Sequence, residues 1–162
     1  MILCRKKEFD RRVTMEIREY KSSDCNEIVD LFYNTVHCIN AKDYTEKQLN
    51  VWATGNIDID EWNESFLNNY TVIVEENGII IGFGDINDEG YLNRLYVHKD
   101  YQSIGVATAI CDRLEKKCDV ERIKTHASIT AKSFFEKRGY KATKKQLVER
   151  DGVMLINYIM EK

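Results

Sequence analysis

The chain has 162 residues, with 24 Lys and Arg against 27 Asp and Glu, and a formal net charge of −3. This balance gives no electrostatic case for a nucleic-acid or acidic-membrane partner, and we expect neither. No apolar run approaches the ~18 residues of a membrane helix, and the composition, 43% hydrophobic and 31% charged, is typical of a single globular domain.

The first fourteen residues, MILCRKKEFDRRVT, are charged and lack the apolar centre of a secretory signal. We interpret residues 1–14 as an N-terminal arm that precedes a domain of residues 15–162. The five cysteines are odd in number and none has CxxC spacing. This argues against a disulfide framework or a metal site and favours a cytoplasmic location.

The first half of the chain contains both hydrophobic patterns, the alternation of a strand and the 3.6-residue period of a helix. Alternation predicts a strand over 16–20, and a period of 3.6 predicts helices from Ser22 or Ser23 to about His37, over 45–53 and over 60–68. Strands follow over 70–75, 79–86 and 91–98, separated by the hairpin signal Asn77-Gly78 and by a turn at Asp88-Glu89-Gly90.

The second half predicts a helix over 104–118, a short strand over 122–126, and a helix over 130–138 that ends at Gly139. Two strands, over 141–150 and 153–160, are joined at Asp151-Gly152. The order indicates an α/β (α+β) fold. We expect one mixed, mostly antiparallel twisted sheet of about seven strands with helices on both faces.

The most informative segment is Leu95 to Ala107, LYVHKDYQSIGVA, in which an apolar strand passes through a polar turn into a helix. Gly105 and Ala107 are small enough to let a ligand approach the backbone. The free N–H groups of a helix N-terminus bind anions such as a diphosphate. A tight strand-to-helix turn that needs a glycine explains the same pattern equally well.

A second segment, AKSFFEKRGY over 131–140, distinguishes between these alternatives. Residues 102–107 are similar to the Q/R-x-x-G-x-G/A acyl-coenzyme A loop of the GNAT superfamily of N-acetyltransferases, and residues 131–140 to that family's A-x-x-F-Y-E-K-x-G-F helix. The order of the elements from Met15 onward agrees as well, so the chain resembles the GNAT superfamily over nearly its whole length.

The resemblance implies acetyl-coenzyme A as co-substrate, with its pantetheine arm between splayed fourth and fifth strands and its diphosphate on the helix N-terminus. An amide of Tyr96 or Val97 would stabilise the oxyanion. The implied cofactor residues are Leu95, Tyr96, Val97, Gln102, Ser103, Ile104, Gly105, Val106, Ala107, Thr108, Ser128, Ala131 and Phe135.

The chain departs from the family pattern where acid–base chemistry is expected. Phe135 replaces the general-acid Tyr, and Tyr91 and Asn93 stand where family members carry a strand-four carboxylate. An amine with a pKa of about 10.4 is only about one part in 2,500 neutral at pH 7, so either a base removes its proton or the substrate amine is less basic. Our candidates are His126 and Glu89, with Asp88 and Asp85 as alternatives.

The resemblance implies transfer of an acetyl group by direct attack of a primary amine on a small molecule or peptide. Trp52, Asn93 and Asn157 are the candidate substrate-binding residues, although burial in the core equally explains Trp52. The missing Tyr and carboxylate favour an alternative, a non-catalytic acyl-coenzyme A-binding or sensing module. A mononucleotide-binding domain is a weaker alternative, because GxGxxG and GxxxxGKS/T are absent. The sequence is compatible with a monomer or a homodimer.

Overall fold

The computed structural model describes residues 14–162, so all of the predicted arm except Thr14 lies outside the described residues. A seven-stranded sheet runs in the order β1-β2-β3-β4-β5-β7-β6. All neighbouring strands are antiparallel except the parallel pair β4 and β5, which confirms the mixed sheet. The strands are β1 (Glu16–Glu19), β2 (Tyr70–Glu76), β3 (Ile79–Ile86), β4 (Tyr91–Val97), β5 (Lys124–Ser128), β6 (Lys141–Arg150) and β7 (Val153–Glu161).

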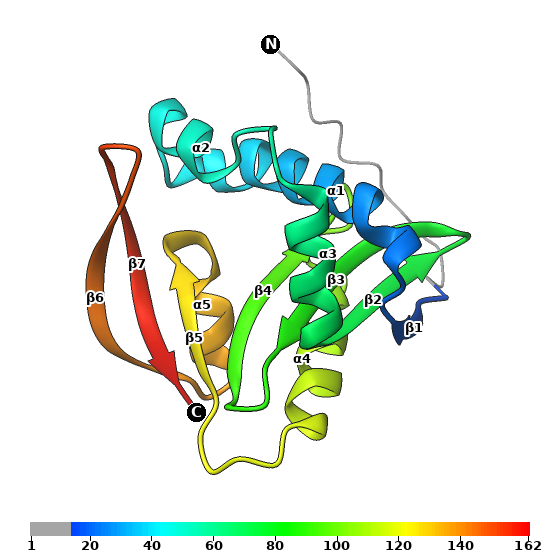
Figure 1. Ribbon diagram of the computed structural model, residues 1–162. Coiled ribbons are helices and arrows are strands. Elements are labelled where there is room, and N and C mark those ends of the chain that lie inside the picture. Colours follow the sequence, from blue (N-terminus) through cyan, green and yellow to red (C-terminus); the bar gives the residue numbers. More distant parts are fainter. Residues whose placement is uncertain (1–13) are drawn as a thin grey trace.

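Helices cover both faces of this sheet (Figure 1). They are α1 (Cys25–Cys38), α2 (Glu46–Trp52), α3 (Ile59–Asn68), α4 (Val106–Lys117) and α5 (Ile129–Lys137), with short 3₁₀ turns η1 (Ser22–Asp24) and η2 (Asn40–Lys42). The helix predicted from residue 104 begins instead at Val106. The reason is local, because Ser103 and Gly105 have φ angles of 62° and 94°, which lie outside the helical region.

The sheet separates two hydrophobic cores, one against α4 and α5 and the other against α1, α2 and α3. On β2, Val72 and Val74 belong to the first core and Ile73 to the second, as the alternation of a strand requires. Gly82 and Gly84 bring α4 close to β3: a Cβ at Gly82 would lie 2.6 Å from Val106 Cγ1, so a larger residue would force a shift in this packing. This packing holds the start of α4 beside the end of β4.

Strands β4 and β5 pair only at Tyr91↔Lys124 and Leu92↔Thr125, and then separate (Figure 1). The separation coincides with a β-bulge, because Asp85 opposes Arg94 while the next residue of β3, Ile86, opposes Leu92. The extra residue on β4 is therefore Asn93. Beyond the bulge β5 stays paired with β7, and this splay confirms the expected gap between β4 and β5.

Candidate active site

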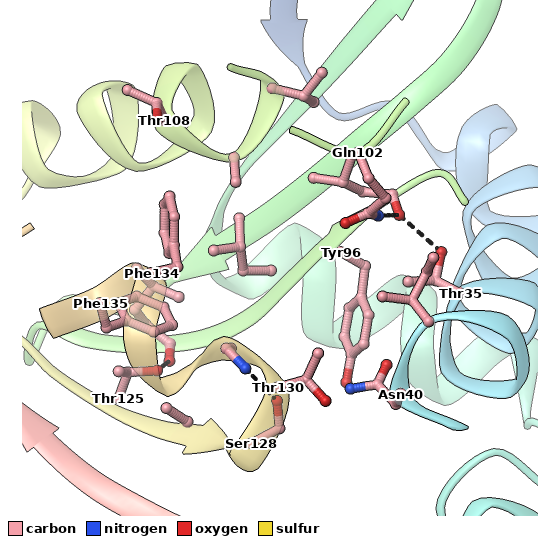
Figure 2. A pocket seen from close by; sticks show the side chains of 18 of the residues that line it. Thr35, Asn40, Tyr96, Gln102, Thr108, Thr125, Ser128, Thr130, Phe134 and Phe135 are labelled. Carbon is pink, nitrogen blue, oxygen red and sulfur yellow. Dashed lines mark hydrogen bonds between the residues drawn. The ribbon is translucent and has the colours of Figure 1, made fainter. Parts of the chain in front are cut away.

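A cavity of about 520 Å³ opens where β4 and β5 separate. It is bounded by β4, β5, the first turns of α4 and α5, and the segment from α1 to η2, and Figure 2 shows side chains from these elements around one space. Every residue predicted for the cofactor lines this cavity except Ile104, whose side chain is 44% exposed. The structure thus brings together residues that span 95–135 in the sequence.

The N-terminus of α4 offers unpaired amides to this cavity. The first backbone hydrogen bond of the helix runs from Ala109 N to Gly105 O, so the N–H groups of Val106, Ala107 and Thr108 have no acceptor within the helix. A Cβ built on Gly105 meets no atom within 4 Å, so the space above the turn is open. Open space beside free amides at a helix N-terminus suits a diphosphate.

The edge of β4 that faces β5 offers further backbone groups. His98 N donates to Ile81 O on β3, and alternation along the antiparallel pair directs the amide of Tyr96 to β3 as well. The amides of Leu95 and Val97 therefore face the gap. Of the two amides expected as the oxyanion donor, that of Tyr96 is thus directed to β3, and Val97 N–H remains available.

The carbonyl of Val97 is already held by protein groups. It accepts hydrogen bonds from Thr35 Oγ1 at 2.9 Å and from Gln102 Nε2 at 2.7 Å (Figure 2). Gln102 Nε2 also lies 3.3 Å from His98 O. Gln102 thus stabilises the turn between β4 and α4, a positioning contribution that the sequence motif alone does not reveal.

Ser128 ends β5 and begins α5, and its Oγ accepts a hydrogen bond from Ala131 N at 3.1 Å. This N-cap fixes the start of α5 at the wall of the cavity. Farther along α5, Phe135 is 2% exposed and its ring centroid lies 5.0 Å from that of Tyr140. The phenol of Tyr140 donates to Glu115 Oε1 at 2.8 Å. Phe135 therefore contributes an apolar wall, and its neighbour's hydroxyl is engaged elsewhere.

The two predicted bases lie in different places. His126 lines the cavity, with its ring centroid 5.2 Å from that of Tyr91 and its Nδ1 3.4 Å from Gln146 Nε2. Partial burial, reinforced by the positive charge of Lys124, lowers the pKa of His126 below its usual value. Glu89 is exposed in the turn between β3 and β4 and is not among the residues that line the cavity.

A second cavity of about 390 Å³ adjoins the first, and Trp52, Asn93 and Tyr96 line both. Its other lining residues are Phe32, Val51, Thr54, Ile57, Trp62, Arg94 and Arg150. Two predicted substrate residues, Trp52 and Asn93, thus lie at the junction. Asn157 lines neither cavity; it pairs with Ser128 across β5 and β7.

Sequence reasoning missed several residues of the two cavities. Thr35, Asn40 and Lys42 reach the first cavity from the end of α1 and from η2, and Arg150 reaches the second from the end of β6. Phe134 belongs to the second motif and Thr130 directly precedes it, and that position is the one signal that pointed to them. The others depend on contacts between distant segments and leave no pattern in the sequence.

Within residues 14–162, no helix is long and apolar enough to span a bilayer. The same residues contain no group of three or more His, Cys, Asp or Glu side chains arranged to hold a metal ion.

The chain is similar to known proteins over most of its length. Residues 40–162 match the family model of the acetyltransferase (GNAT) domain. The chain is 31% identical over 146 residues to the uncharacterized N-acetyltransferase YafP of Escherichia coli (strain K12), covering 90% of this chain and 94% of that protein.

Two solved structures share the fold. A GCN5-related N-acetyltransferase from Rhodopseudomonas palustris superposes with a TM-score of 0.88 at 30% identity, covering 92% of this chain and 95% of the other. The putative acetyltransferase yncA from Salmonella typhimurium, solved with its cofactor acetyl-coenzyme A, superposes with a TM-score of 0.68 at 19% identity, covering 92% and 93%. The chain belongs to the GNAT family of N-acetyltransferases.

Proposed function

We propose that this enzyme transfers an acetyl group from acetyl-coenzyme A to a primary amine of a small molecule or peptide by direct attack. The observation that carries the proposal is the cavity between the separated ends of β4 and β5. There the unpaired edge of β4 lies next to the free amides at the start of α4. The pantetheine amides would pair with backbone groups of Leu95. The diphosphate would bind the amides of Val106, Ala107 and Thr108.

The second cavity supports entry of the acceptor from the other side of β4. The two cavities meet at Asn93 and Tyr96, so an amine held in the second cavity would face a thioester held in the first. The amine nitrogen forms a bond to the carbonyl carbon, the carbon–sulfur bond breaks, and coenzyme A leaves as the thiolate. Val97 N–H would stabilise the oxyanion between these steps.

His126 is the candidate that would remove the proton from the attacking amine. Its lowered pKa keeps the ring neutral, and therefore able to accept a proton, near pH 7. Because a thiol of pKa about 8.5 is a tolerable leaving group, solvent can protonate the departing thiolate without a hydroxyl at Phe135. This route requires no covalent intermediate on the enzyme.

The test is release of free coenzyme A thiol from acetyl-coenzyme A in the presence of a panel of primary amines. The proposal predicts amine-dependent release and an acetylated amine detectable by mass spectrometry. The non-catalytic binding module predicts tight coenzyme A binding with no release that depends on any amine. A reaction without amine measures the hydrolysis background, which amine-dependent release must exceed and which the binding module would not exceed.

A further inference from the structure

The second cavity has aromatic walls. The rings of Phe32 and Trp62 lie 5.0 Å apart between centroids, and Phe32 also packs edge-on to Tyr96 at 4.9 Å. Trp52 stands at the junction with the first cavity, edge-on to Tyr44 at 5.1 Å. Both indoles are partly exposed, so they offer flat apolar surface to an occupant. A planar apolar body fits such walls.

Two arginines line this cavity, but the charge of Arg94 is already balanced. Its Nη1 lies 2.8 Å from Oδ2 of Asp85, whose side chain is fully buried, and its Nη2 donates to Ser65 Oγ at 3.0 Å. The guanidinium also stacks on Trp62 and Phe66, at 4.8 and 4.6 Å from their centroids. Arg94 therefore forms part of the wall and contributes little uncompensated charge.

Arg150 differs, because no ion pair or hydrogen bond joins its side chain to the part of the chain that the structure describes. It is the last residue of β6, in a hairpin anchored to the helical layer. Gln48 Nε2 donates to Met154 O at 2.9 Å, and the Tyr44 hydroxyl donates to Ile156 O at 2.7 Å. These contacts fix the backbone of the hairpin beside the cavity, and the exposed side chain of Arg150 lines the cavity with its guanidinium donors open.

No Asp or Glu is among the described residues that line either cavity. The local charge is therefore positive although the whole chain carries −3. Within the acetyl transfer proposed above, on which this inference rests, we propose that the acceptor amine also carries a carboxylate on a planar apolar body. The carboxylate pairs with Arg150, the body lies against Trp52 and Trp62, and the amine points toward Asn93 and Tyr96. A guanidinium binds a carboxylate through two parallel hydrogen bonds.

The chain offers a direct readout of this cavity, because its two tryptophans, Trp52 and Trp62, both line it. Intrinsic fluorescence is followed while para- or meta-(aminomethyl)benzoate is titrated into the full-length protein. The matching benzamides keep the ring and the amine and remove the charge. We expect at least one acid to bind about tenfold or more tightly than its amide, and Arg150→Gln to abolish this preference.

Lys145→Gln is the matched control, since it removes an exposed cation from the same strand, β6, at a position that lines neither cavity. It should retain the preference for the acid. Equal affinity for acid and amide, no fluorescence response to any of the four compounds, or a preference that survives Arg150→Gln would overturn the inference.

Turnover with acetyl-coenzyme A separates this inference from the proposed function. Faster release of thiol with the acids than with the amides, through a lower KM that depends on Arg150, supports the carboxylate subsite. Release with neutral amines that Arg150→Gln leaves unchanged contradicts the subsite while leaving acetyl transfer intact. Failure of every amine to promote release, despite acid-selective binding, contradicts the proposed function and leaves the carboxylate site standing.

Discussion

Asp85 on β3 and Arg94 on β4 form an ion pair of 2.8 Å beneath the second cavity, and the Asp85 side chain is completely buried. Burial raises the pKa of Asp85, and the positive charge of Arg94 opposes that shift. Asn69 Nδ2 donates to the same Oδ2 at 2.7 Å and Asn93 Nδ2 at 3.5 Å, so three side-chain donors, Arg94 included, meet this carboxylate. The pair holds the β3–β4 register beside the bulge at Asn93.

Replacing one partner of this pair is therefore costly. Arg94→Met should lower the free energy of unfolding by about 3–5 kcal/mol at pH 8, because a buried carboxylate loses its counter-ion. Without Arg94 the pKa of Asp85 rises further, so protonation at lower pH relieves the charge and the loss should be smaller at pH 5. Urea unfolding at the two pH values measures both effects. The account would be contradicted if the free energy of unfolding fell by less than about 1 kcal/mol, or if the loss were larger at pH 5 than at pH 8.

Gly105 and Gly152 provide a matched test of the turn before α4. Both have positive φ, 94° and 76°, and a Cβ at either meets nothing within 4 Å. Replacement of either glycine by alanine should lower the free energy of unfolding by about 1 kcal/mol, because alanine is strained at positive φ. Gly105→Ala should in addition weaken coenzyme A binding tenfold or more, since the methyl group occupies the space beside the helix amides. Calorimetric titration checks this, and equal affinities of the two variants for coenzyme A would refute the placement of the diphosphate.

His126 is testable through its pH dependence. His126→Gln should lower kcat about 100-fold, within the range for loss of a general base. Because the pKa of His126 lies below about 6.5, the ring is a competent base above that pH, and wild-type kcat should fall as pH drops through its pKa. The variant should lack this acid limb. His37→Gln is the control, since His37 contacts Ala53 O and lines neither cavity. An acid limb that persists in His126→Gln assigns the proton to another group.

Thr35 ties α1 to the end of β4, and a second buried threonine serves as its control. Thr35 Oγ1 donates to Val97 O at 2.9 Å, and Thr71 Oγ1 donates to Phe66 O at 2.8 Å. Replacement of either threonine by valine should lower the free energy of unfolding by about 1 kcal/mol, because a carbonyl loses the hydrogen bond from the threonine hydroxyl. Only Thr35→Val should also weaken acetyl-coenzyme A binding, several-fold, because it releases the strand end that faces the cavity. A loss of affinity shared by both variants would point to general destabilisation.

Local signals in the sequence predicted much of the fold. Asn77 and Gly78 adopt positive φ in the turn they predict, and so do Asp151 and Gly152 at the other hairpin. The predicted ends of helices and strands were less accurate. The strand expected over 122–126 runs from Lys124 to Ser128, because its extent is set by pairing with β7. No local pattern reports that partner.

The lining of the first cavity was largely predictable because one turn and one helix start supply most of it. The lining of the second cavity was not, because it depends on contacts between distant segments. In the sequence Arg94 is an ordinary polar residue of a strand, and only the structure reveals its ion pair with Asp85. Arg150 reads as a solvated charge next to a hairpin, yet the packing of β7 on α2 brings it to the cavity. The chain as a whole carries a net charge of −3, whereas the side chains that line the second cavity favour an anionic group.

The most direct test of the account is a map of backbone amides that respond to acetyl-coenzyme A in isotope-labelled protein, read by nuclear magnetic resonance. The account predicts that the largest shifts fall on Leu95, Val97 and the first turn of α4, Val106 to Thr108, with small shifts along β2 and β6. Saturable binding that leaves those amides unmoved would contradict it, because the thioester would then lie somewhere other than between β4 and β5.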